Sequence, residues 1–274
     1  MVNLFIADFD YSEYQGGAEL VDQTIREKLD LKLVKSRLIV PDFITPENTY
    51  VISNYTGLSE HVKNKLVSLG NYIIFEHDYK IHRTRQPNQF PEELFPKHEL
   101  TNLDFIKAAK AVFMQSKDHL DCHLRNGVEG NLIALEGSIW SDQELSRLSF
   151  LHNCPIKTHK FAVIDSSNIW KGTKQAVEFC ENANVEYDLL PPQNLFDFYQ
   201  TLASYPTLVY FPIVKESFCR LVVEAKALNC NVITSKSYGA AKETWFNIYG
   251  KEMLDFLKLS TKNNIQELSK YLKS

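Results

Sequence analysis

Short apolar runs alternate with amphipathic stretches along the chain, and this pattern occurs twice. In the first half, five apolar runs predict strands at residues 2–7, 49–53, 72–75, 111–115 and 131–135. After the first run, apolar side chains recur three or four residues apart, which predicts a helix with one buried face carrying Ala18, Val21, Ile25 and Leu29. Strands that alternate with helices in this way are typical of βα units and a parallel sheet.

The second half repeats the pattern. It predicts strands at residues 160–164, 185–190, 207–212 and 231–235, with helices from about Thr173, from about Asn194 and around Glu224. Residues 152–159 form the expected boundary. We therefore predict an α/β protein with two Rossmann-like, doubly wound parallel-sheet domains, residues 1–153 and 154–274. The two domains are expected to face a cleft at the carboxyl ends of their strands, where such sheets bind ligands.

One segment, residues 77–100, contains three prolines and has no clean period. Loops of this length in compact domains are often functional, and a solvated insertion explains the segment equally well. The segment carries Lys80, Arg83 and Arg85, which would either bind an anionic acceptor or lipid headgroup or form a solvated basic rim.

Composition narrows the class of protein. The chain has 274 residues, of which 44% are apolar, and this is enough to build a substantial core. Asp8 and Asp10 interrupt the amino-terminal apolar run before a signal peptide could be completed, and no run of 18 apolar residues follows, so we expect a cytoplasmic protein. The five cysteines are scattered without a CxxC pair, which favours reduced thiols. A net charge of −4 gives no support for nucleic-acid binding.

Two glutamates raise the question of a binding site. Glu216 follows a predicted strand and precedes a predicted helix, at a position where free N–H groups and the helix dipole attract an anion such as phosphate. Glu224 lies eight residues further on, about 12 Å along the helix at 1.5 Å per residue. The pair could hold hydroxyls at two ends of an extended ligand. A helix cap followed by an unrelated surface acid would give the same spacing.

The stretch from Val214 to Glu243 resembles the donor-site signature of retaining GT-B glycosyltransferases of the family 4-like, group 1 type. The residues in register with that signature are Glu216, Phe218, Glu224, Ala225, Ala227, Val232, Ile233, Gly239 and Glu243. The resemblance implies that Glu216 faces the transferred sugar and that Glu224 holds the nucleotide ribose. It also implies that N–H groups around Ser217, Phe218 and Cys219 face the diphosphate. Ser217 and Cys219 stand where the family has glycines.

Two further motifs agree with this resemblance. "YQGGAEL" is similar to the family's amino-terminal Gly-Gly-Ala-Glu turn, which implies that Gly16 and Gly17 lie near the donor phosphate and acceptor; a simple turn into a helix has the same appearance. "VIDSSNIWKGTKQAVEF" places Lys171 where the family's lysine neutralises the diphosphate, with serines near the position of the usual arginine. Lys215 and Arg220, which flank Glu216, are candidates to replace that arginine.

Histidines occur only in the first part of the chain, at or before His159. His77 follows a predicted strand, and the resemblance implies a contact with the sugar near the reacting centre; a structural histidine fits as well. His119 and His123 have the i, i+4 spacing of metal ligands, but no third ligand stands in a matching motif. We therefore expect no metal site.

The resemblance implies a glycosyltransferase that moves a hexose-type sugar from a UDP- or GDP-linked donor to an acceptor hydroxyl, with retention at the anomeric carbon. The nucleotide sugar is a substrate, and no cofactor or metal is expected. The acceptor is a glycan, a lipid-linked molecule or a small molecule, and contact with the inner face of a membrane is left open. Two alternatives share the architecture: a catalytically weakened nucleotide-sugar-binding or partner subunit, and a sugar-nucleotide epimerase.

Overall fold

The computed structural model describes residues 3–154, 157–235 and 237–272 and divides the chain into two compact units. The first unit contains Met1–Ile139 and Ser260–Ser274, and the second contains Trp140–Leu259. This division differs from the expected boundary after residue 153. Helix α5 (Asp142–Leu151) packs three leucines into the core of the second unit, and the last turns of α9 (Gly250–Lys270) pack into the first. Pro155 and Ile156 of the expected boundary lie outside the described residues.

The first unit contains a parallel sheet with the strand order β2-β1-β3-β4-β5-β6. The strands are β1 (Asn3–Ala7), β2 (Lys32–Lys35), β3 (Thr49–Ile52), β4 (Tyr72–Glu76), β5 (Val112–Met114) and β6 (Leu132–Ala134). Five of these six were predicted from apolar runs. The missed strand, β2, lies at the sheet edge, and it alternates lysine with Leu33 and Val34 instead of forming a continuous apolar run.

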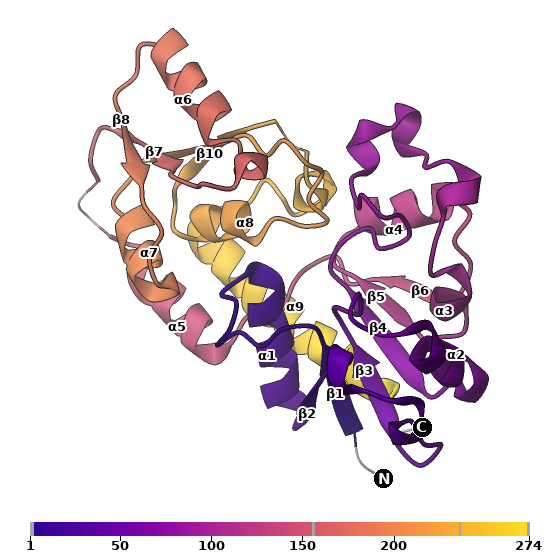
Figure 1. The fold of residues 1–274 in the computed structure, drawn as a ribbon. Coiled ribbons are helices and arrows are strands. Elements are labelled where there is room, and N and C mark those ends of the chain that lie inside the picture. Colours follow the sequence, from indigo (N-terminus) through magenta and orange to yellow (C-terminus); the bar gives the residue numbers. More distant parts are fainter. Residues whose placement is uncertain (1–2, 155–156, 236, 273–274) are drawn as a thin grey trace. The chain divides into compact units, whose positions relative to one another are not determined.

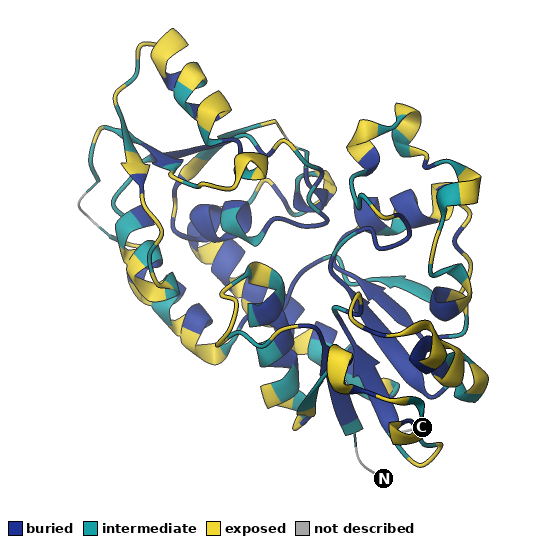
Figure 2. Cartoon of the chain, viewed as in Figure 1, coloured by how far each residue is buried: buried dark blue, intermediate teal, exposed yellow. Residues whose placement is uncertain are grey.

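Both faces of this sheet are covered by helices (Figure 1). Leu4 and Ile6 of β1 pack with α2 (Glu60–Leu69), α3 (Leu103–Lys107) and α4 (Lys117–Arg125), whereas Phe5 and Ala7 pack with α1 (Gly17–Leu29) and the end of α9. This alternation follows the two-residue period of a strand. Because both faces are covered, the four inner strands β1, β3, β4 and β5 are mostly apolar, and they are buried along most of their length in Figure 2.

The second unit contains a parallel sheet with the order β10-β9-β7-β8. Its strands are β7 (Phe161–Ile164), β8 (Tyr187–Leu190), β9 (Thr207–Tyr210) and β10 (Asn231–Thr234). Helix α6 (Thr173–Asn182) covers one face, and α5, α7 (Leu195–Leu202), α8 (Arg220–Ala227) and the start of α9 pack on the other (Figure 1). The predicted strands and helices of this half are confirmed to within a few residues at each end.

The two sheets reverse their winding direction next to β1 and next to β7. In the first unit the reversal lies between β1 and β3, and in the second it lies between β7 and β9. In open α/β sheets, ligands bind outside the carboxyl ends of the strands at such a reversal. The residues after Ala7, Ile52, Ile164 and Tyr210 are therefore the first places to search for a site.

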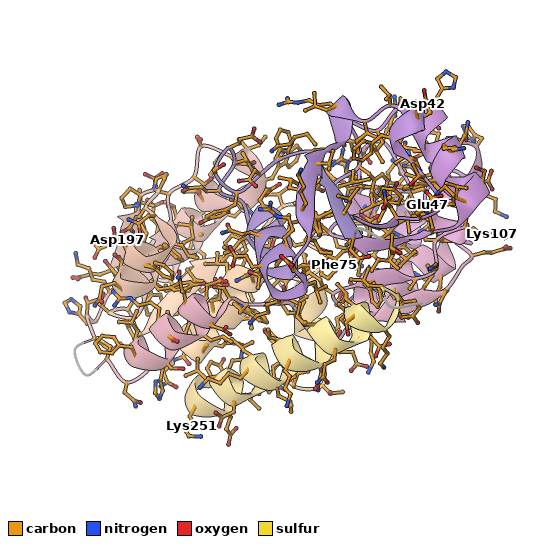
Figure 3. The ribbon with its side chains drawn as sticks, turned by 90° about the horizontal axis from the view of Figure 1, so that it is seen from below. Asp42, Glu47, Phe75, Lys107, Asp197 and Lys251 are labelled. Carbon is orange, nitrogen blue, oxygen red and sulfur yellow. The ribbon has the colours of Figure 1, made fainter. Side chains whose placement is uncertain are left out.

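The segment from His77 to Leu100 is an ordered loop with the 3-10 turns η3 (Pro87–Gln89), η4 (Pro91–Glu93) and η5 (Lys97–Glu99). Lys80 is buried and pairs with Glu76 at 2.6 Å and Asp78 at 2.9 Å, so it does not belong to a solvated basic rim. In Figure 3, Lys107 points outward from the first unit, whereas Phe75 of β4 is fully buried within it.

Within the described residues, no helix is long and apolar enough to cross a membrane. Of the five cysteines, Cys154 is partly buried and the other four are buried, and all five are free thiols in the described residues.

Candidate functional site

A polar cluster lies at the winding reversal of the second unit's sheet. Tyr210 is the last residue of β9, and its hydroxyl donates to Glu216 Oε1 at 2.6 Å. Lys171 Nζ donates to the same oxygen at 3.0 Å from the turn η6 (Ile169–Lys171), which follows β7. Two loops that leave neighbouring strands therefore meet at one carboxylate. The Glu216 side chain is 18% exposed and that of Lys171 is 44% exposed, so the ion pair lies at the surface of the unit.

The ionisation of Glu216 depends on these partners. Burial by itself raises the pKa of this carboxyl, but the Lys171 charge and the hydrogen bonds from Tyr210, Lys171 and Cys219 outweigh burial and lower the pKa below its usual 4.5. Burial, with the neighbouring Cys219 and Glu216, raises the pKa of the Tyr210 phenol. At neutral pH the site therefore holds a carboxylate, an ammonium group and a neutral phenol.

Backbone pairing holds the Glu216 loop in place. Glu216 N donates to Ser237 O at 3.1 Å, Gly239 N donates to Glu216 O at 3.0 Å, and Ala240 N donates to Phe218 O at 3.1 Å. These bonds join the two ends of the stretch that resembles the donor signature. Lys236, between them, lies outside the described residues.

Three residues of that stretch lie directly before α8, which begins at Arg220. Phe218 is buried between Trp140 and Trp245, with ring centroids 6.2 and 6.0 Å apart, and Ser217 is also buried. Cys219 is the N-cap residue of α8 and has φ 76°, a left-handed conformation that glycine, the residue of the resembled signature at this position, adopts most readily. The loop therefore adopts the conformation of a glycine-containing turn although it has a cysteine.

The turn that carries Lys171 is held by Gly172. Its φ is +70°, and a Cβ built on it would lie 1.7 Å from Phe211 O. Next to this close approach, Ile213 N donates to Trp170 O at 3.0 Å. Only glycine permits this contact between the loops after β7 and β9, so Gly172 fixes the position of its neighbour Lys171. No sequence pattern had marked Gly172 as a site residue.

Glu224 and Arg220 belong to a second, buried cluster on the inner side of α8. Arg220 Nε and the Trp140 indole N–H each donate to Glu224 Oε1 at 3.0 Å. Arg220 Nη2 also pairs with Glu144 of α5. The guanidinium thus lies between two carboxylates, which does not favour the expected role of Arg220 beside the diphosphate. Lys215, the other candidate, is buried.

Trp140, Glu144 and Tyr210 were missed by sequence reasoning. Trp140 and Glu144 lie about 80 residues before Glu224, so no local motif connects them to it. Tyr210 could have been predicted as a site residue, because its hydroxyl-bearing side chain ends a mostly apolar strand at the carboxyl edge of the sheet.

In the first unit, His77 directly follows β4, at the carboxyl end of the sheet, and contacts helix α1. Its Nε2 contacts Asp22 Oδ1 of α1 at 2.7 Å, and its Nδ1 lies 3.4 Å from Gln115 Nε2. Ser53, which follows β3, donates to both oxygens of Asp22 at 2.7 and 2.8 Å. The His77 ring is therefore fixed, and its contact with Gln115 is longer than its contact with Asp22.

Gly16 and Gly17 lie where they were expected, at the amino end of α1. Gly16 is the N-cap with an ordinary extended φ of −96°, and a Cβ there would lie 2.3 Å from Glu19 Oε2. The glycine therefore makes room for the Glu19 carboxylate. Glu19 is buried, and burial raises its pKa. The predicted residues Gly16, Gly17 and His77 thus share one end of the first unit.

The metal-ligand spacing of His119 and His123 corresponds to a buried aromatic cluster. His119 Nε2 contacts Asp78 O at 2.8 Å, and His123 Nδ1 contacts His119 O at 3.0 Å. Both rings pack on Tyr79. In the ranges that the structure describes, no group of three or more His, Cys, Asp or Glu side chains could hold a metal ion.

Several solved protein structures are similar to the structure of this chain. No protein-family model matches the chain, and no curated protein matches its sequence significantly. The trehalose-6-phosphate synthase OtsA is 12% identical with a TM-score of 0.54, covering 96% of this chain and 83% of that one. HepE from Anabaena, in complex with UDP, is 15% identical with a TM-score of 0.52, covering 99% and 92%.

A third similar structure is the UDP-forming α,α-trehalose-phosphate synthase from Burkholderia xenovorans in complex with glucose-6-phosphate. It is 9% identical with a TM-score of 0.53, covering 96% of this chain and 84% of that one. The matches extend over almost the whole of this chain, and the order of elements is that of two doubly wound α/β units. The chain therefore has the GT-B fold that these glycosyltransferases share.

Proposed function

We propose that the protein is a glycosyltransferase that moves a sugar from a nucleoside-diphosphate sugar to an acceptor hydroxyl. The observation that carries this proposal is the cluster of Lys171, Glu216 and Tyr210 at the winding reversal of the second sheet. This is the place in such a sheet where ligands bind. The GT-B fold, shared with a protein solved in complex with UDP, supports the same assignment.

In this proposal Lys171 stabilises the departing diphosphate. Its ammonium group is partly exposed beside the amino end of α8, where backbone N–H groups also favour an anion. Positive charge placed where negative charge develops lowers the barrier to departure of the leaving group. Glu216, held ionised by Lys171 and Tyr210, would face the transferred sugar and accept hydrogen bonds from its hydroxyls.

We further propose a retaining hexosyltransferase that requires no metal ion. UDP is the favoured nucleotide, because the names of two similar structures include UDP or UDP-forming, and a hexose is favoured because HepE has also been solved with UDP and glucose. Donor-site roles are proposed for Ser217, Phe218, Cys219 and Lys215 through the loop before α8. The acceptor is a glycan, a lipid-linked molecule or a small molecule.

In the first unit we propose that His77, Gly16 and Gly17 bind the sugar or the acceptor. Asp22 fixes the His77 ring through Nε2, so Nδ1 is the nitrogen that a substrate hydroxyl would reach in place of the longer Gln115 contact. Gly16 and Gly17 would contribute the amino end of α1.

A second candidate, a nucleotide-sugar-binding protein without transferase activity, is favoured by one observation. The two cations nearest to the expected diphosphate position already have carboxylate partners: Lys171 pairs with Glu216, and Arg220 pairs with Glu144 and Glu224. A diphosphate must compete with Glu216 for Lys171. Such a protein would bind the nucleotide without breaking the bond to the sugar.

The test is turnover with labelled UDP- and GDP-sugars and a panel of acceptors. We expect release of one nucleoside diphosphate that depends on acceptor and is reduced about 100-fold or more in Lys171→Met. Lys174→Met is the matched control, because Lys174 is exposed and its nearest carboxylate is Glu178 at 3.7 Å. Nucleotide binding without turnover in any combination would support the second candidate, and turnover unaffected by Lys171→Met would contradict the proposed site.

A further inference from the structure

Glu224 is held by a chain of contacts that begins on a different helix. Ser141 is the N-cap of α5, and Glu144 completes the capping box by accepting from Ser141 N and Oγ at 2.8 Å each. The other oxygen of Glu144 accepts from Arg220, and Arg220 in turn donates to Glu224. The amino end of α5 thus fixes the Arg220 guanidinium, which lies on α8.

A second restraint on Glu224 comes from Trp140. Its indole N–H donates to the same carboxylate oxygen, Oε1, and its ring lies 5.0 Å from the Arg220 guanidinium. The ring also packs edge-on against Phe218. Trp140 therefore joins the Glu224 carboxylate to the loop that carries Glu216.

This cluster is charged and almost dry. The side chains of Glu144, Arg220 and Glu224 are 1%, 9% and 6% exposed. Burial lowers the pKa of Arg220, but the two carboxylates outweigh burial and raise it, so the guanidinium stays charged. The trio joins one guanidinium to two carboxyl groups. A buried charge of this kind is costly unless it accepts further hydrogen bonds.

Glu224 has acceptor capacity for such bonds. A carboxylate offers about four acceptor positions. Arg220 and Trp140 both use Oε1, and the Tyr199 hydroxyl of α7 also hydrogen-bonds to Glu224, so these three contacts leave capacity for a further donor. With Oε1 restrained on two sides, the carboxylate plane is fixed and Oε2 has a defined direction. Adjacent hydroxyls of a ribose are donors that need such a fixed acceptor.

We infer that Arg220, Glu144 and Trp140 are positioning residues that orient Glu224 for the ribose of the nucleotide, and that they set the preference of the site for ribose over deoxyribose. This inference rests on the proposed function. It replaces the expected role of Arg220 as a diphosphate ligand, because the guanidinium is bound by Glu144 and Glu224.

The test compares the dissociation constants of UDP and 2′,3′-dideoxyuridine 5′-diphosphate, and of GDP and its dideoxy analogue, by titration calorimetry. Wild-type protein should prefer the ribose form of the nucleotide that binds by about tenfold or more, because each hydrogen bond to a charged acceptor contributes about 1.5 kcal/mol or more. The variants are Trp140→Phe, which keeps a packed ring and removes the N–H donor, and Arg220→Lys. In both, the preference should fall below about threefold.

Tyr205→Phe is the matched control. It removes the hydroxyl that donates to Asp188 Oδ2 at 3.0 Å in the same unit, and so destabilises that unit by about 1 kcal/mol through a contact that involves neither Glu144, Arg220 nor Glu224. The control should keep the wild-type preference for ribose, which separates positioning from stability. Arg220→Lys retains a cation between the carboxylates, so it remains informative if a neutral substitution does not fold.

Two results would overturn the inference while leaving nucleotide binding intact. One is a wild-type protein that binds UDP or GDP without preferring ribose, and the other is a preference that Trp140→Phe and Arg220→Lys both retain. Failure of the wild-type protein to bind UDP, GDP or their analogues would instead contradict the proposed function, and the inference with it.

Discussion

Gly172→Ala is the substitution whose effect can be worked out most fully from the structure. A side chain at φ +70° costs about 1–2 kcal/mol for an L-residue. In addition, the new Cβ would lie 1.7 Å from Phe211 O, and it must move about 1.3 Å to reach the 3.0 Å at which real contacts begin. A shift of that size breaks the nearby bond from Ile213 N to Trp170 O, which costs about 1 kcal/mol more.

The expected loss is therefore about 2–3 kcal/mol for Gly172→Ala. Gly127→Ala is the matched control, because Gly127 has φ +76° and no atom within 4 Å of the built Cβ, so only the backbone cost of about 1–2 kcal/mol applies. Urea unfolding followed by far-UV circular dichroism gives both values. Tryptophan fluorescence reports the second unit separately, because Trp140, Trp170 and Trp245 all lie in it.

Gly172→Ala should also weaken UDP binding, since Lys171 is the adjacent residue. The reasoning would be refuted by a Gly172→Ala protein that is no less stable than Gly127→Ala, because the close approach to Phe211 O would then cost nothing. A large loss of stability with unchanged UDP affinity would show that the turn is structural and that Lys171 is not a ligand.

Three further predictions concern pH and metal ions. Because its partners lower the pKa of Glu216, the ionised carboxylate contributes stability that is present above pH 4.5 and is lost as pH falls through the lowered pKa. Urea denaturation at a series of pH values should show that the difference in unfolding free energy between wild type and Glu216→Gln disappears in acid. A difference that persists at pH 2 would contradict the ion pair. Burial lowers the pKa of His123 from 6.5 to about 4, so protonating this histidine destabilises the fold as pH falls over that interval. The acid-induced loss of unfolding free energy should be smaller in His123→Leu than in wild type, by up to about 3 kcal/mol. An equal loss in both proteins would contradict the lowered pKa of His123. Excess EDTA should leave sugar transfer unchanged, whereas a loss restored by Mg²⁺ would contradict the expected independence from metal.

The sequence predicted most of the fold, because parallel strands buried on both faces leave continuous apolar runs. The exceptions have physical reasons. Edge strand β2 lacks such a run. The compact units divide after Ile139 and Leu259, and not after residue 153, because α5 and the two ends of α9 take part in tertiary packing that no local pattern records.

The candidate site was predicted less completely than the fold. The sequence placed Lys171 and Glu216 in one site, and the structure joins them at 3.0 Å. It could not show that Arg220 is bound by Glu144, because that contact spans 76 positions. Nor could it show the partner of His77, since Asp22 lies on the helix after another strand. The proposed ligand roles of these residues stay predictions until a nucleotide is tested.

The central claim is that a nucleoside diphosphate binds at the winding reversal of the second unit's sheet. Hydrogen exchange of backbone amides, measured by mass spectrometry with and without saturating UDP or GDP, tests it directly. Exchange should slow in residues 165–173 and 213–224, and this protection should be lost in Lys171→Met. Protection confined to other segments, or no change with either nucleotide, would contradict it.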